Sequence, residues 1–228
     1  MSDPLPRRLC AEALGTAFLL ATVIGSGVMG ERLSGGNVAL ALLANTLPTG
    51  AILVVLILIF GAVSGAHFNP AVTIACALSG MFSWSEVAAY IVAQVAGAIV
   101  GVLAAHAMFD LPIFQVSTHA RVGLPQGFAE VVATFGLLLT IFGCAARAPA
   151  AVPYAVGLYI TAAYWFTAST SFANPAVTVA RALSDTFAGI APAGVPAFIL
   201  AQMIGALLAG AAARQLWPVI AVKHGAPV

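Results

Sequence analysis

The sequence contains one pentapeptide twice: Asn69-Pro70-Ala71-Val72-Thr73 recurs unchanged as Asn174-Pro175-Ala176-Val177-Thr178. Asparagine is a preferred residue immediately before a helix, and proline fits the first helical position because its missing N–H is not needed there. The repeat therefore predicts two short helices, one beginning at each asparagine.

The composition indicates a membrane protein. Of the 228 residues, 62% are hydrophobic and 7% are charged, whereas a soluble domain has about 25% charged residues. A spanning helix needs about 20 apolar residues, and the pattern predicts six spans, at residues 8–29, 38–61, 86–107, 126–145, 150–168 and 194–216. This composition excludes a soluble enzyme, and the net charge of +1 leaves no basic surface for nucleic acid.

Two uncharged stretches are longer than their predicted spans require. Residues 33–85 and 148–180 contain no Asp, Glu, Lys or Arg, and each stretch includes one copy of the pentapeptide. A segment that enters the membrane without crossing it must be buried in protein or line an aqueous cavity. We therefore expect two re-entrant half-helices.

Two further matches show that the whole chain is duplicated. Residues 11–16 match 129–134, and residues 93–98 match 201–206. The repeats are expected at about 8–110 and 125–217, within a single transmembrane domain over 1–228. Because each repeat has three crossings, the second copy must be inverted relative to the first. The predicted fold is an all-α membrane protein with six transmembrane helices and two re-entrant half-helices in an inverted three-helix repeat.

The basic residues predict the orientation in the membrane. The N-terminal region lacks a signal-peptide cleavage site, so we expect the first helix to be a retained span. The positive-inside rule places both termini in the cytoplasm, because five basic residues fall on one side and Arg32 and Arg121 on the other; the five are Arg7, Arg8, Arg147, Arg214 and Lys223.

The cysteines do not indicate a metal site. Cys10, Cys76 and Cys144 lie within or beside apolar segments, and their spacing fits no metal-binding pattern. We expect them to behave as small hydrophobic residues. Neither a metal nor another cofactor is predicted.

The two half-helices are expected to meet by their N-termini near the middle of the bilayer. Each N-terminus carries about half a unit of positive charge, and Asn69 and Asn174 would point amide donors into one cavity. Such a cavity attracts the oxygen of water or a neutral hydroxylated solute and repels protons and metal cations. An ion-coupled transporter is the alternative for an inverted repeat, but neither pentapeptide segment carries an ionisable group before Arg181. A membrane enzyme is not expected, because no nucleophile, base and orienting group occur together.

The segment from Ser64 to Thr73, the second Asn-Pro-Ala and the glutamates of the first and fourth helices resemble the major intrinsic protein superfamily, the aquaporins and aquaglyceroporins. The resemblance implies a right-handed bundle, one pore per subunit and a homotetramer in the lipid bilayer. It also implies that Glu12 and Glu130 brace the backbone of the re-entrant loops. A proton relay through these glutamates is the alternative, since an ionisable group at that depth needs a role or a partner.

Counted from the two asparagines as in the family, the resemblance places a second constriction, the selectivity filter, at Thr49, Ala162, Ser171 and Val177. Water-specific members have an aromatic residue at the first position, histidine at the second and arginine at the fourth. None of the three is present, so we expect a wider, less positive and more apolar mouth without the filter arginine.

Such a mouth suits uncharged solutes that are bulkier than water. The stretch Thr170–Arg181 resembles bacterial channels associated with arsenic resistance, which pass arsenite and methylated arsenicals. The predicted function is a passive channel in the bacterial inner membrane for arsenous acid, methylated arsenicals, glycerol, urea and some water. A general glycerol and water facilitator without a role in arsenic transport is the alternative.

Two further residues allow two interpretations each. Arg181 lies one helical turn beyond Val177; it either extends to the pore mouth and partly replaces the lost cation barrier, or lies at the end of the half-helix and pairs with Asp185. His67 is either a pH sensor or packs within the re-entrant loop and donates to backbone carbonyls.

Overall fold

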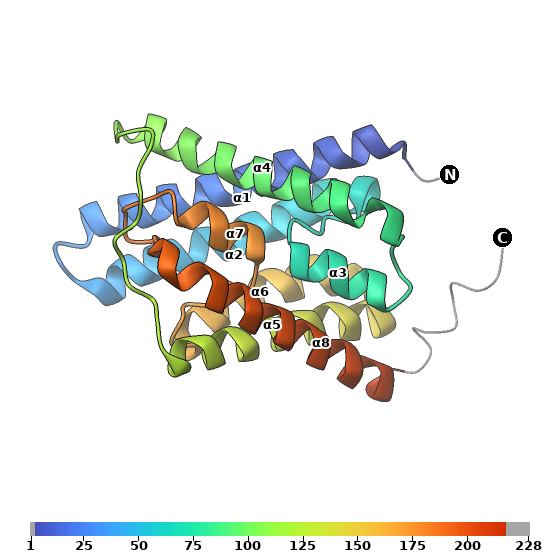
Figure 1. Cartoon of the computed structure of the whole chain (residues 1–228). Coiled ribbons are helices and arrows are strands. Elements are labelled where there is room, and N and C mark those ends of the chain that lie inside the picture. The colour runs from blue at the N-terminus through green and yellow to red at the C-terminus, as the bar shows by residue number, and fades with distance from the viewer. Residues whose placement is uncertain (1–2, 218–228) are drawn as a thin grey trace.

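The computed structural model describes residues 3–217 as a bundle of helices (Figure 1). The long helices are α1 (Leu5–Leu33), α2 (Val38–Ser64), α4 (Trp84–Met108), α5 (Leu124–Arg147), α6 (Val152–Phe166) and α8 (Val195–Leu216). The short elements are α3 (Pro70–Leu78), α7 (Pro175–Arg181) and the 3-10 turns η1 (Pro149–Ala151) and η2 (Pro192–Gly194). The predicted fold class is confirmed. Lys223, one of the basic residues used to predict the orientation in the membrane, lies outside the described residues.

The fifth predicted span is shorter than expected. It was placed at 150–168, whereas α6 has 15 residues, Val152–Phe166. Residues 149–151 form η1 instead, and the chain leaves the helix at Thr167, whose backbone is extended. The other five long helices are each long and apolar enough to cross a membrane.

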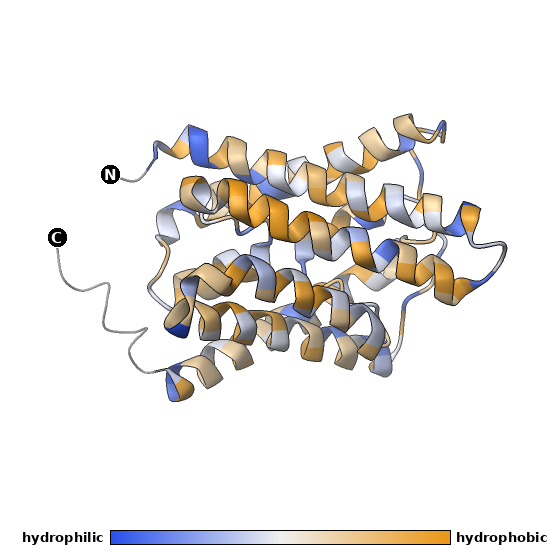
Figure 2. Cartoon of the chain, turned by 180° about the vertical axis from the view of Figure 1, so that it is seen from behind, coloured by the Kyte–Doolittle hydropathy of each residue, from blue (hydrophilic) through white to orange (hydrophobic). Residues whose placement is uncertain are grey.

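The outer faces of the long helices are apolar. Figure 2, in which the ribbon is coloured by hydropathy, shows mostly hydrophobic residues along the helices seen from behind. The exposed side chains include Phe18, Leu58, Ile59, Val92 and Leu207. A helix that is hydrophobic on its exposed face as well as its packed face is suited to lipid rather than water. The bundle therefore has the surface of a membrane-embedded protein.

Glycines allow the main helix pairs to pack closely at matched places in the two repeats. α1 packs on α4, and α5 packs on α8. A Cβ atom added at Gly97 would lie 2.2 Å from the Ala13 carbonyl oxygen, and one added at Gly205 would lie 2.5 Å from that of Val131. Small residues at such contacts let two helix backbones approach within the membrane. The matched stretches 93–98 and 201–206 therefore contain the glycines at which the two helix pairs pack.

The two half-helices lie inside the bundle, and their N-termini face each other. α3 and α7 each contact α4, α8 and one another. α1 begins and α8 ends at the same end of the bundle (Figure 1), as an even number of crossings requires. We call the end of the bundle near the C-terminus of α3 the inner end and the end near the C-terminus of α7 the outer end.

Candidate functional site

The two asparagines join the half-helices through reciprocal hydrogen bonds. Asn69 Nδ2 donates to the Ala173 carbonyl at 2.8 Å, and Asn174 Nδ2 donates to the Phe68 carbonyl at 2.8 Å. The side-chain oxygens cap the helices, because Asn69 Oδ1 accepts from Ala71 N at 2.9 Å and Asn174 Oδ1 accepts from Ala176 N at 3.0 Å. A carboxamide nitrogen has two N–H groups, so each asparagine retains one donor for the cavity that both residues line.

Glu12 holds the first re-entrant loop from behind. Its carboxylate accepts hydrogen bonds from His67 N at 3.0 Å and Phe68 N at 2.7 Å. It also accepts from Ser64 Oγ at 2.6 Å and from Gln94 Nε2 at 2.8 Å. Buried and fully engaged, the carboxylate positions the loop backbone.

Glu130 holds the second loop in the same way. Its two oxygens accept from Phe172 N and Ala173 N, both at 2.9 Å, and from Gln202 Nε2 at 2.6 Å. Neither glutamate is among the residues that line the cavity. A proton relay along the pore would require carboxylates in contact with its contents, so this arrangement favours the bracing role.

The bracing stabilises an unusual backbone. Ala66 and Phe68 in the first loop, and Ser171 and Ala173 in the second, have φ between 48° and 50°. This left-handed conformation is uncommon for residues other than glycine and costs about 1 to 3 kcal/mol per residue. Charge-assisted hydrogen bonds from the adjoining amides to Glu12 and Glu130 offset that cost.

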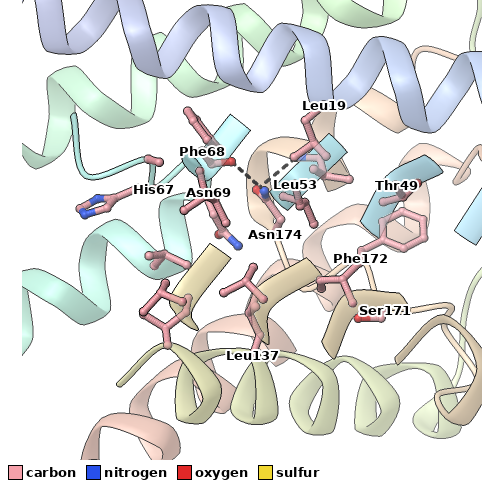
Figure 3. A pocket seen from close by; sticks show the side chains of 18 of the residues that line it. Leu19, Thr49, Leu53, His67, Phe68, Asn69, Leu137, Ser171, Phe172 and Asn174 are labelled. Atoms are coloured by element: carbon pink, nitrogen blue, oxygen red, sulfur yellow. Dashed lines mark hydrogen bonds between the residues drawn. The ribbon is translucent and has the colours of Figure 1, made fainter. Parts of the chain in front are cut away.

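One cavity passes the asparagine pair and extends toward both ends of the bundle (Figure 3). Its volume is about 270 Å³, which is several times the space of one water molecule, about 30 Å³. The two re-entrant loops and the asparagines give it a polar side. The opposite wall is apolar and comes from α1, α2, α5 and α6, through residues that include Leu19, Val23, Leu53, Ile57, Leu137, Ile141, Val156 and Ile160.

At the outer end, the cavity is lined by three of the four predicted filter residues. Thr49, Ser171 and Val177 lie on its wall, and Figure 3 shows Thr49 and Ser171 on the opposite side of the asparagines from His67. Thr49 Oγ1 donates to the Asn45 carbonyl at 2.8 Å. Its hydroxyl hydrogen is therefore engaged, and it offers a solute an acceptor and a methyl group.

Ala162 does not line the cavity, contrary to the prediction. It is exposed, on the outward face of α6 with Leu158 (68% exposed) and Trp165 (49% exposed). Tyr164 lines the cavity instead, four residues after Ile160 and eight after Val156. Residues spaced by four share a helix face, so this periodicity identifies Tyr164, whereas counting back from Asn174 passes through a non-helical loop and gives the wrong face.

Arg181 does not pair with Asp185. The Asp185 carboxylate accepts from Thr118 N at 2.7 Å and Thr118 Oγ1 at 2.9 Å, and these bonds hold the pKa of this exposed carboxyl below its usual value. Arg181 is 1% exposed. Its Nε donates to the Ala188 carbonyl, its guanidinium carbon lies 3.4 Å from the centroid of the Phe172 ring, and it lines the outer end of the cavity.

His67 lines the cavity on the other side of the asparagines. Its Nδ1 lies 3.1 Å from Thr73 Oγ1, so this partner is a hydroxyl rather than the backbone carbonyls that the packing interpretation expected. The ring packs against Phe82 and Tyr90, and Arg8 lies over both of these rings. The sequence pattern did not predict this cluster, because Arg8 and His67 lie far along the chain from Phe82 and Tyr90.

The cysteines are not grouped. Cys76 is buried and lines the cavity, Cys10 is exposed and Cys144 is half-buried, and all three are free thiols. Among residues 3–217, no three His, Cys, Asp or Glu side chains are arranged to hold a metal ion.

Comparison with known proteins agrees with this geometry. Residues 2–151 match the family described as Major intrinsic protein. Aquaglyceroporin AqpS of Rhizobium meliloti is 56% identical over 212 residues, which cover 93% of this chain and 91% of the relative. A probable NIP-type aquaporin of Nicotiana alata is 33% identical over 88% of this chain and 74% of its own length.

A solved structure shares the fold. The aquaglyceroporin of Plasmodium falciparum superposes with a TM-score of 0.71 at 23% identity, covering 95% of this chain and 99% of the other. Together with the two half-helices and the cavity between them, these similarities show that the chain belongs to the major intrinsic protein family and is a multi-pass membrane channel rather than an enzyme.

Proposed function

We propose that the protein is a passive channel for neutral solutes larger than water, with arsenous acid, methylated arsenicals, glycerol and urea as substrates and with some water permeability. The observation that carries the proposal is the continuous cavity, which has the small residues Thr49, Ser171 and Val177 on its wall beside Tyr164 and Arg181. The name of the aquaglyceroporin relative supports glycerol. The arsenical substrates rest on the sequence likeness of residues 170–181.

The chemistry of the cavity suits such solutes. Asn69 and Asn174 each offer an N–H donor to a passing oxygen, and the facing wall of leucine, isoleucine and valine side chains accepts the carbon edge of a polyol. A binding site with few placed polar groups in an apolar wall fixes the orientation of a small ligand without binding it tightly. Weak binding at successive positions is what conduction requires.

An ion-coupled transporter fits the geometry less well. Glu12 and Glu130 lie behind the loops, with their oxygens engaged by backbone and glutamine donors. Coupling requires an ionisable group that the substrate and the ion reach together. Uptake against a gradient that collapses on adding an uncoupler would support the transporter; equal downhill flux in both directions supports the channel.

We further propose a homotetramer in the bacterial inner membrane with both termini in the cytoplasm. The positions of the ends of α1 and α8 at one end of the bundle support the shared side (Figure 1). Cross-linking in native membranes and protease accessibility from each side test these two statements separately.

The decisive test is stopped-flow permeation in proteoliposomes with water, glycerol, urea and arsenous acid. Val177→Arg is expected to lower glycerol and arsenous acid flux by about tenfold and water flux less, because a guanidinium would narrow the mouth. Val177→Leu is the matched control, which adds bulk without charge and should reduce flux only slightly. Unchanged glycerol and arsenous acid flux in Val177→Arg would overturn the filter assignment, and a wild-type protein that passes water alone would overturn the solute assignment.

A further inference from the structure

Val177 occupies the position at which water-specific members of the family have the filter arginine. One turn further along α7, however, the chain has an arginine, Arg181. Arg181 follows Val177 by four residues, so the two share a helix face, and both line the outer end of the cavity. Side chains on a helix lean toward its N-terminus, which in α7 is the end at Asn174. The Arg181 guanidinium accordingly lies over the ring of Phe172, in the loop that precedes α7.

The guanidinium is held in place rather than mobile. Its Nε donates to the Ala188 carbonyl, and its planar group lies against the Phe172 ring with 3.4 Å between the guanidinium carbon and the ring centroid. The Arg181 carbonyl accepts from Ile190 N at 3.3 Å, which fixes the end of α7 to the loop that follows. A stacked and hydrogen-bonded arginine has little conformational freedom left to lose on binding a ligand.

Two polar atoms at this end of the cavity have no hydrogen-bond partner within residues 3–217. They are Arg181 Nη1 and Ser171 Oγ, and both are buried. Their residues line the same cavity. A buried donor that lacks a partner is unfavourable, so the site favours a ligand with an oxygen that accepts from Nη1 and a hydroxyl group that bonds to Ser171.

The charge of Arg181 also lacks a paired carboxylate in the described part of the chain. Asp185 is engaged by Thr118, and the buried carboxylate of Glu130 is engaged by Phe172 N, Ala173 N and Gln202. A second guanidinium is nearby: the carbon of the Arg121 guanidinium lies 5.2 Å from the centroid of the same Phe172 ring, and Arg121 donates to the Gly189 and Ser169 carbonyls. The outer end therefore carries net positive charge, which raises the free energy of a cation there.

We propose that Arg181 is the cation of the selectivity filter, displaced by one helical turn, and that with Ser171 it forms an oxygen-binding subsite for neutral polyhydroxylated solutes. The proposal rests on the proposed channel function. A filter arginine both narrows the pore and excludes cations. Here the pore is not narrowed beside Val177, and Arg181 in the adjacent turn excludes cations and orients the solute.

The test uses Arg181→Gln, Arg181→Lys and Ser171→Ala in full-length protein, with folding checked by gel filtration and thermal melting. Sodium current is measured in voltage-clamped bilayers, and glycerol flux is measured against glycerol concentration. We expect Arg181→Gln to raise sodium current by about tenfold, because its neutral side chain removes the electrostatic barrier, and to weaken half-saturation by glycerol. Arg181→Lys keeps the charge, so it should exclude sodium yet show the weakened half-saturation.

Ser171→Ala leaves the charge in place and should change only the glycerol concentration dependence. If Arg181→Gln does not fold, Arg181→Met is the neutral variant for the sodium current, while the lysine and alanine variants still decide the oxygen-binding part. The proposal is overturned if glycerol half-saturation and sodium current in the folded variants equal those of the wild type. Failure of the wild type itself to pass glycerol, urea or arsenous acid would instead overturn the proposed function.

Discussion

The two repeats are alike where they hold the half-helices and unlike where the half-helices end. In both, a glutamate accepts from two consecutive backbone amides of the loop, and a glutamine bonds to that glutamate and to a threonine of the half-helix. Seven residues after the asparagine, however, the first repeat has Cys76 and the second has Arg181, and both line the cavity. The comparison shows that the duplicated part sets the geometry of the pore, while this matched position carries a charged side chain in the second repeat and an uncharged one in the first.

The loops around the half-helices differ as well. The first loop, residues 65–69, is short and its supporting network includes Ser64 and Tyr90, since Tyr90 donates to the Ser64 carbonyl at 2.9 Å. The loop that follows the second half-helix is hydrogen-bonded to the connection between α4 and α5. Ser117 N donates to the Ala182 carbonyl, and Ala191 N donates to the His119 carbonyl. The inner mouth is therefore held mainly by the helices, and the outer mouth by another loop.

The largest expected effect is the loss of either brace. Glu12→Leu and Glu130→Leu would each leave two buried loop amides without an acceptor, which costs about 1 to 3 kcal/mol per amide. A melting temperature falls by about 2 to 4 °C per kcal/mol in a chain of this length. Each substitution also releases one glutamine, Gln94 or Gln202. We expect Glu12→Leu to be the more damaging, because it releases Ser64 as well.

Thermal melting in detergent and glycerol flux measure this pair of variants. Glu86→Gln is the control, because Glu86 forms a partly exposed ion pair with Arg8 at 2.9 Å, and such pairs contribute about 0 to 1 kcal/mol. A larger loss of stability in Glu130→Leu than in Glu12→Leu would show that the two networks are not ranked by their number of donors.

A smaller effect, on glycerol flux, is expected from chemical modification of the Cys76 thiol, which occupies the position in the first repeat that matches Arg181. A small membrane-permeant reagent that methylthiolates Cys76 should lower glycerol flux by about twofold or more, because the added group occupies a cavity a few side chains wide. Cys76→Ala should abolish this inhibition. That variant retains Cys10 and Cys144, so continued inhibition would mean that a cysteine outside the cavity is responsible.

The smallest effect concerns the outer loop. Hydrogen bonds from Thr118 lower the pKa of Asp185 in the folded protein, so the carboxylate stabilises the fold above the pKa of the unfolded chain, near 4. This contribution is lost as the pH falls through the lower folded pKa. Asp185→Asn should therefore melt slightly below the wild type at pH 6, and the difference should shrink as the pH is lowered below 4. A difference that is the same at pH 6 and below pH 4 would contradict the assignment.

Much of this fold could be predicted from the sequence, because each motif occurs in both repeats and each prediction therefore rests on two observations. The half-helices begin at Asn69 and Asn174, as the proline after each asparagine predicts. The placement of Glu12 and Glu130 behind the loops follows the family resemblance. These residues act through contacts that both repeats share.

The predictions for Ala162 and for the Arg181–Asp185 pair were wrong, and in both cases non-helical chain separates the two residues that were related to each other. Ala162 was assigned by counting from Asn174 across residues 167–174, where Thr170, Ser171 and Ala173 adopt left-handed conformations that nothing in their side chains requires. The Arg181–Asp185 pair was one of two interpretations of an arginine at the end of the half-helix. α7 does end at Arg181, but Asp185 lies against Thr118 instead. Long-range loop contacts fix these side chains, and local sequence periodicity does not contain them.

The reciprocal asparagine bonds have a consequence for biosynthesis. Asn69 donates to a carbonyl 104 positions later in the chain, and Asn174 donates to one 106 positions earlier. A nascent chain that has inserted only its first three spans has no acceptor from the second repeat for Asn69, and its half-helix has no counterpart to abut. The part of the pore beside the two asparagines is thus assembled only after the ribosome has delivered the second repeat, so the partly made protein does not contain a complete pore.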